Sequence, residues 1–150
     1  IASLSIDRIT RFLNWIIGKN KSTILHSLFS IFYWITFASF LTLMLVFVSP
    51  TFDKSYTWLA TILCILLIAT PTDHRFALLT FIAGTGLGYF LERWGTTREC
   101  WTYYTLQKPP LFAVLAHGMA AVAFWRAGLM VKMVLGKLNM GKQLSGIREH

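Results

Sequence analysis

Charged residues are scarce in this sequence of 150 residues, of which only 13% are Asp, Glu, Lys or Arg. A soluble domain usually carries about 25% charged residues. In their place the chain has 55% hydrophobic residues and a mean hydropathy of +0.58. These apolar residues are grouped in long blocks, as in integral membrane proteins. The composition therefore argues against a soluble domain and predicts a single membrane domain over residues 1–150.

Acidic residues and catalytic motifs are scarcer still. The six Asp and Glu residues all lie outside the middle of the apolar blocks, so the ionisable relay of a proton or ion transporter is lacking. There is no G-x-S-x-G, H-E-x-x-H or P-loop motif. The two cysteines, Cys64 and Cys100, have no metal-ligand spacing and are expected at different membrane depths, which argues against a disulfide. These absences favour a non-catalytic protein without a metal site.

Four apolar blocks predict an all-α integral membrane protein whose four transmembrane helices form an up-down bundle. Residues 28–49 contain no charged side chain, and a helix of that length crosses the hydrocarbon core. Tyr33 and Trp34 lie near one end of this predicted span. Because a short turn joins the first two blocks, these two helices are expected to pack antiparallel. The other predicted spans are residues 56–71, 76–92 and 110–133, with Pro50, Pro71, Pro109 and Pro110 at block ends.

Two further segments lie outside the predicted spans. Residues 1–18 place apolar side chains at helical spacing, while Asp7 and Arg11 lie off this stripe. Such a sequence predicts an N-terminal amphipathic helix that lies in the membrane interface or docks against a partner subunit. Residues 134–150 are expected to form a basic tail.

Positive charge is distributed unevenly between the two sides of the predicted bundle. The side that carries both termini has ten Lys and Arg residues, and the opposite side has four. By the positive-inside rule, both termini are expected on the cytoplasmic or equivalent side. The net charge of +8 then favours contact with anionic lipids at this face, and nucleic acid is not an expected partner.

Glycine and charge are concentrated around the end of the third predicted span. Gly84 and Gly88 form a G-x-x-x-G pair, which lets a neighbouring helix approach closely. Glu92 and Arg93 follow at the expected end of this span. The carboxylate of Glu92 is expected to pair with a nearby base and to play a structural role, although a catalytic or proton-relay role is the alternative. The candidate bases are Arg93, Arg98 and Lys108.

Aromatic residues crowd the loop that follows this span. They are typical of an aromatic belt at the membrane interface, and the alternative is a lid that touches a lipid, quinone or carotenoid. The four aromatic residues are Trp94, Trp101, Tyr103 and Tyr104.

A short pattern in this loop adds a resemblance. Glu92-x-x-Gly95 followed by Trp101-x-Tyr103 resembles loop motifs of small membrane proteins associated with carotenoid synthesis. The resemblance covers about a dozen residues and implies an isoprenoid or carotenoid substrate. The set of acidic residues that such enzymes use is not evident in this chain.

His117 is the one histidine expected inside a span. Ala113 precedes it by one helical turn, and Ala116 and Gly118 leave room beside it. This A-x-x-x-H spacing looks like the chlorophyll-ligating helix of light-harvesting polypeptides, which implies a (bacterio)chlorophyll or haem ligand. The alternative is a neutral histidine hydrogen-bonded to another helix.

Together these features predict a non-catalytic accessory or assembly subunit of a larger membrane complex, of respiratory or photosynthetic type, which contacts integral membrane subunits and lipid. One alternative is a small membrane enzyme that acts on an isoprenoid, carotenoid or lipid, with Glu92, Trp101, Tyr103 and His117 near its site. The other is a pigment- or haem-binding subunit that uses His117. The residues expected to contact partners or lipid are Gly84, Gly88, Glu92, Arg93, Trp94, Trp101, Tyr103 and Tyr104.

Overall fold

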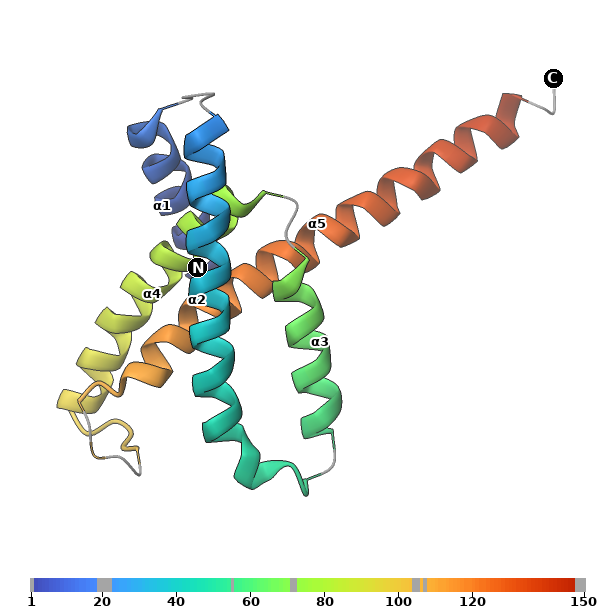
Figure 1. The fold of residues 1–150 in the computed structure, drawn as a ribbon. Helices are drawn as coiled ribbons and strands as arrows, with labels where there is room; N and C mark the ends of the chain where they lie inside the picture. Colours follow the sequence, from blue (N-terminus) through green and yellow to red (C-terminus); the bar gives the residue numbers. More distant parts are fainter. Residues whose placement is uncertain are drawn as a thin grey trace.

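The computed structural model is an all-helical bundle of five α-helices, which are labelled in Figure 1. It describes residues 2–18, 23–54, 56–70, 73–103, 106 and 108–147. A 3-10 turn, η1 (Ser49–Thr51), follows the second helix. The α-helices are α1 (Ala2–Ile17), α2 (Thr23–Val48), α3 (Thr57–Ala69), α4 (His74–Thr97) and α5 (Leu111–Ile147).

Two stretches of these helices, Ile24–Thr51 and Leu111–Lys137, are long and apolar enough to cross a membrane. They are the only two such helices among the described residues. The third apolar helix, α3, has 13 residues and extends about 20 Å at 1.5 Å per residue. This is shorter than a hydrocarbon core of about 30 Å.

The observed helices are longer than the predicted spans at several ends. The α4 helix begins before residue 76, at His74, because the Asp73 carboxylate caps it by accepting a hydrogen bond of 2.9 Å from the Phe76 N–H. It also continues past Glu92 to Thr97. The α5 helix runs without a break through most of the predicted tail and extends away from the other helices (Figure 1).

The hydrophobic core lies where α2, α3, α4 and α5 meet. Tyr33 of α2 is completely buried there, and its hydroxyl donates a hydrogen bond to the Ile68 carbonyl of α3. The ring therefore packs inward, and its one polar atom has a partner inside the protein. The other core residues are Phe37, Ala77, Phe81, Met119 and Val122.

The N-terminal helix α1 packs against α4. Arg75, in the first turn of α4, donates hydrogen bonds to the carbonyls of Asn14 and Gly18 at the C-terminal end of α1. A guanidinium at this position complements the negative end of the α1 dipole. The apolar stripe predicted for this helix is largely turned away from the bundle, with exposed side chains that include Leu4, Phe12 and Ile16.

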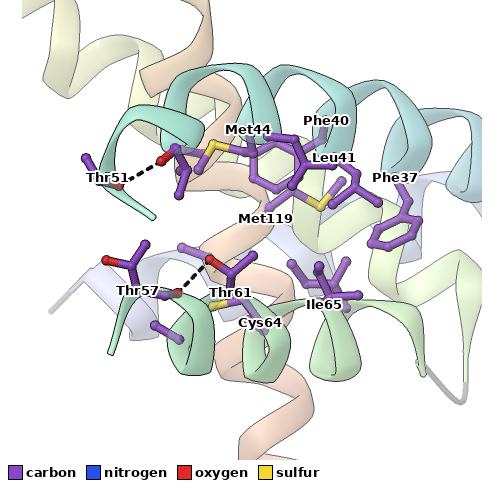
Figure 2. A pocket seen from close by; sticks show the side chains of 17 residues that line it. Phe37, Phe40, Leu41, Met44, Thr51, Thr57, Thr61, Cys64, Ile65 and Met119 are labelled. Atoms are coloured by element: carbon purple, nitrogen blue, oxygen red, sulfur yellow. Dashed lines mark hydrogen bonds between the residues drawn. The ribbon is translucent and has the colours of Figure 1, made fainter. Parts of the chain in front are cut away.

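The α2 and α3 helices run antiparallel, but they do not pack along their lengths as predicted (Figures 1 and 2). They meet at one end through Tyr33 and Ile68. Below that contact an apolar pocket of about 480 Å³ separates them, with α5 as its floor. We call this pocket the slot. Residues from all three helices line it, among them Phe40, Met44, Cys64, Ile65, Ala116 and Ala120.

Candidate functional site

The site is built on one face of α4, where small residues let α5 approach closely. Gly84 and Gly88 are both buried against α5. A Cβ atom added to Gly84 would lie 2.7 Å from the Cβ of Ala121, and one added to Gly88 would lie 2.5 Å from the Cβ of His117. The close helix contact predicted for this glycine pair is therefore present, and it is formed with α5 of the same chain.

Glu92 and Gly95 continue this face toward the C-terminal end of α4. Positions four and seven residues beyond Gly88 return to the same side of a helix. The indole of Trp101 lies on Gly95, where any Cβ atom would clash with the ring. The loop after α4 thus folds back over its own helix at the turn that carries Glu92.

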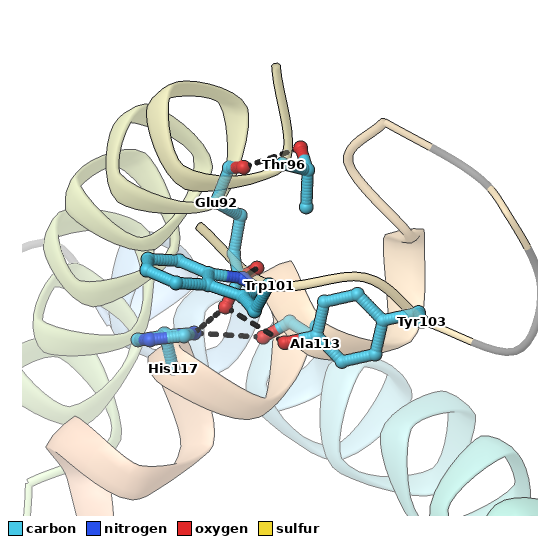
Figure 3. Close-up of polar contacts among 6 residues, drawn as sticks. All are labelled: Glu92, Thr96, Trp101, Tyr103, Ala113 and His117. Carbon is cyan, nitrogen blue, oxygen red and sulfur yellow. Dashed lines mark hydrogen bonds and ion pairs between the residues drawn. The ribbon is translucent and has the colours of Figure 1, made fainter. Parts of the chain in front are cut away.

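Glu92 is buried, and its side chain is only 5% exposed. The Trp101 indole N–H donates a hydrogen bond of 3.0 Å to Oε2, and the Tyr103 hydroxyl donates one of 3.1 Å to Oε1 (Figure 3). The Nδ1 atom of His117 lies 3.9 Å from Oε1. We call Glu92, Trp101, Tyr103 and His117 the Glu92 cluster. Burial of a carboxylate requires partners of this kind, because an unpaired buried charge is costly.

The predicted basic partners of Glu92 are elsewhere, so that prediction is wrong. The Arg93 guanidinium donates to the Lys108 carbonyl over 3.4 Å. The Lys108 ammonium lies 3.5 Å from Glu99, and the Arg98 guanidinium lies over the Trp94 ring. All three bases are exposed, whereas Glu92 is buried on the face of α4 that meets α5.

The structure also divides the predicted aromatic belt. Trp101 and Tyr103 donate hydrogen bonds to Glu92, whereas the Trp94 ring lies under the Arg98 guanidinium. Both tryptophans are partly exposed, Trp94 to 49% and Trp101 to 40%. Tyr104 lies outside the described residues. The contacts with a partner or lipid predicted for these residues stay predictions.

His117 is held in one orientation by its own helix. Nδ1 lies 2.8 Å from the carbonyl oxygen of Ala113, and a carbonyl oxygen only accepts hydrogen bonds. Nδ1 therefore carries a hydrogen in this contact, and in the neutral imidazole Nε2 is the acceptor. The imidazole packs against α4 at Gly88, where the lack of a side chain leaves room for it, so α4 also determines the position of the ring.

The small residues beside His117 make room for α4. A Cβ atom on Gly118 would clash with Thr85 and Phe81, both from α4. The space that a flat tetrapyrrole was expected to use at Gly118 is therefore occupied by protein. Nε2 remains the ring nitrogen suited to a metal, and pigment or haem ligation stays a prediction.

A second apolar pocket, of about 450 Å³, lies beside the cluster. We call it the head pocket. Its polar side chains are Tyr103 and His117, and its apolar wall includes Phe47 and Phe112, whose rings stack at 4.1 Å. It shares four lining residues with the slot, so the two pockets adjoin. The shared residues are Met44, Val48, Ala116 and Ala120.

Tyr103 links this pocket to the buried carboxylate. Burial raises the pKa of its phenol, and the hydrogen bond to Glu92 and the charge of that carboxylate raise it further. The phenol therefore stays protonated at neutral pH and donates to Glu92. Its ring also meets Phe112 edge to face at 5.5 Å.

The described residues contain no group of three or more His, Cys, Asp or Glu side chains that could hold a metal ion. Neither a protein-family model, nor a curated protein, nor a solved structure matches this chain. The chemistry of the site is therefore argued from the Glu92 cluster and the two pockets.

Proposed function

We propose that this protein is a small membrane enzyme that binds an isoprenoid or another long-chain lipid and acts on its polar end by proton transfer. The observation that supports it is the Glu92 cluster, which places a buried carboxylate behind two polar side chains that line an apolar pocket. Ligand pockets commonly combine apolar walls with a few convergent polar groups. The slot accepts the chain, and the head pocket accepts the end that reacts.

The role of each side chain in the Glu92 cluster is assigned from whether it is exposed to the head pocket. Tyr103 and His117 line the head pocket and are the groups that meet the ligand, whereas Glu92 is nearly inaccessible. Glu92 is accordingly a positioning residue, which holds the Tyr103 hydroxyl and lies within 3.9 Å of His117. A phenol and an imidazole are both suitable for general acid–base chemistry.

The experiment is a turnover assay of the purified protein in nanodiscs, with a membrane lipid extract as substrate and mass spectrometry of the products. His117→Asn is expected to lower the rate by about 10²–10⁴-fold, the usual contribution of general acid–base catalysis. His26→Asn is the matched control, since His26 is exposed on α2. Equal rates for His117→Asn and the parent protein, or no conversion of any lipid, would contradict the proposal.

We also propose that α2, α3, α4 and α5 all cross the membrane, with both termini on the cytoplasmic side. The apolar surface of α2 and α3 supports this, since Phe32, Ile35, Ile62 and Leu66 are each at least half exposed in the isolated chain. In the first turn of the short α3, Trp58 stacks on Phe52 of the α2–α3 connection at 4.0 Å. Such aromatic residues are typical of the interface.

Cys100 tests this topology because its thiol is exposed in the loop after α4. In a Cys64→Ser background, a membrane-impermeant maleimide should label Cys100 in right-side-out vesicles and leave it unlabelled in inverted ones. The reverse result would place the loop and the Glu92 cluster at the cytoplasmic face.

A second candidate function, an accessory subunit that contacts integral membrane partners and anionic lipids, is favoured by the C-terminal half of α5. Residues 131–137 are all exposed, and they include Val131, Met133, Val134 and Leu135 beside Lys132 and Lys137. An apolar helix that extends beyond its own bundle needs another surface to cover it. Truncation after Met133, the last residue of the predicted span, should then release co-purifying subunits without loss of the inserted bundle. Unchanged co-purification would argue against this candidate.

A further inference from the structure

We infer that the ligand of the two adjoining pockets is electrically neutral, a long hydrocarbon that ends in a hydroxyl group, and that anionic phosphates and diphosphates are excluded. This inference rests on the proposed function, because it specifies which lipids the slot and the head pocket accept. It is carried by the charges of the side chains around both pockets.

The first observation is the absence of cations. In the part of the chain that the structure describes, no Lys, Arg, Asp or Glu side chain lines either pocket. A phosphate or diphosphate held in a dry pocket needs Arg, Lys or a metal ion to replace its hydration. The slot and the head pocket supply only aromatic, aliphatic and small polar groups, together with His117.

The second observation is the sign of the nearest charge. Glu92 lies directly behind Tyr103 and His117, with its Oε1 3.1 Å from the Tyr103 hydroxyl oxygen. A buried carboxylate repels an anion strongly, because the low dielectric of the interior screens it poorly. A neutral hydroxyl experiences no such repulsion. It can donate a hydrogen bond to the Tyr103 oxygen or to Nε2 of His117, because the Tyr103 O–H is already donated to Glu92 and the His117 Nδ1–H to Ala113.

The third observation concerns the bases at this end of the bundle. Arg93, Arg98 and Lys108 are all exposed, and each interacts with the loop or with α4 at the surface. Lys108 is directed to Glu99, whose side chain is 74% exposed. None of these bases lines either pocket, so a phosphate group would have to remain outside to reach them.

The test compares ligands with the same chain and different heads, in detergent without divalent cations. One pair of probes is farnesol and farnesyl diphosphate, and the other is hexadecanol and hexadecyl phosphate. The affinity of each probe is measured by its competition with the tritiated alcohol of its own pair. Specific binding is the part removed by Ala120→Phe, which fills the junction between the two pockets. We expect each alcohol to bind more tightly than its phosphate partner, by a factor of about ten or more.

The variant Glu92→Gln then isolates the cause. It removes the charge and one of the two acceptor oxygens that Trp101 and Tyr103 use. The ratio of phosphate to alcohol affinity is the readout, and it should approach one. Glu99→Gln removes an exposed carboxylate of the same loop and should leave the discrimination unchanged.

The experiment distinguishes a failure of the neutral-ligand inference from a failure of the proposed function. If a phosphate binds as tightly as its alcohol and Ala120→Phe removes both, the pockets bind lipid but the neutral-ligand inference is wrong. Discrimination that Glu92→Gln leaves intact would also contradict the inference. If neither alcohol shows binding that Ala120→Phe removes, the proposed function itself is contradicted.

Discussion

The two sides of α5 differ in how the protein uses small residues. On the side that faces α4, Gly118 and Ala121 meet the side chains or the backbone of α4 at close range. On the side that faces α2 and α3, Ala116, Ala120 and Ala123 line open space. The same residue types therefore produce a tight interface on one side and a pocket on the other.

The residues of the facing helix decide whether α5 forms a tight interface or lines a pocket. Glycines on α4 remove the side chains that would keep α5 away, so Gly84 and Gly88 bring the two helices into contact. Larger residues such as Phe40 and Met44 on α2 and Ile65 on α3 separate the other helices. The tight interface can then hold the Glu92 cluster rigidly, while the open side admits a ligand.

The largest expected effect comes from breaking the tight interface at Gly88. Gly88→Leu places a side chain where the Cβ of His117 already lies, 2.5 Å from any added Cβ. We expect a loss of about 3 kcal/mol in stability, the upper part of the range for overpacked cores. A thermal unfolding assay in detergent measures it as a clear fall in Tm.

Gly86→Leu is the matched control on the same helix. An added Cβ at Gly86 meets nothing within 4 Å, and leucine favours the helix over glycine by about 0.8 kcal/mol. We expect an unchanged or slightly higher Tm. Equal effects of the two substitutions would show that α4 and α5 are not in close contact at Gly88.

The tight interface was the part of the structure that the sequence predicted well. The spacing of Gly84 and Gly88 is a local signal with one physical meaning, close approach of another helix. The all-helical fold followed equally from local periodicity and apolar blocks. The packing of α1 on α4 did not, since the sequence placed this helix in the membrane interface or on a partner subunit. The alternative that grouped Glu92, Trp101, Tyr103 and His117 named residues that the structure places together.

The slot on the side of α5 that faces α2 and α3 could not be predicted from the sequence in the same way. The slot exists because α2 and α3 meet only at their ends, and Tyr33 turns inward to reach Ile68. Nothing local in either helix indicates that contact. For Glu92, nearby bases suggested ion pairs, but α4 continues to Thr97 and directs the carboxylate toward α5. Such choices depend on tertiary packing.

A smaller effect is expected from Tyr103→Phe, which weakens the cluster without overpacking it. The change removes one hydrogen bond to a charged group and leaves Trp101 on Glu92. The expected cost at neutral pH is about 1–2 kcal/mol. Chemical unfolding of the purified variant, followed by tryptophan fluorescence, measures it.

The same variant has a defined pH dependence. Because the pKa of Tyr103 is raised in the folded protein, its stabilising contribution is complete below the unfolded pKa of about 10 and is lost as the pH rises above that value. The difference between parent and Tyr103→Phe should therefore shrink at alkaline pH. Tyr56→Phe is the control, since Tyr56 is 81% exposed. A difference that grows above pH 10 would contradict the hydrogen bond to Glu92.

The smallest effect on stability is expected on the open side of α5, at Ala120. Ala120→Leu extends into the junction of the slot and the head pocket, where no other side chain has to move. We expect a change of less than about 1 kcal/mol, as for substitutions that force no repacking. Ala121→Leu is the comparison on the closed side of α5. The Cβ of Ala121 faces Gly84 so closely that a Cβ added to Gly84 would lie only 2.7 Å away. Little space therefore remains for a larger side chain at position 121. Thermal unfolding of the two variants side by side should show Ala120→Leu close to the parent and Ala121→Leu strongly destabilised. If the two cost the same, the contrast between the closed and open sides of α5 is wrong, and with it the space assigned to a ligand.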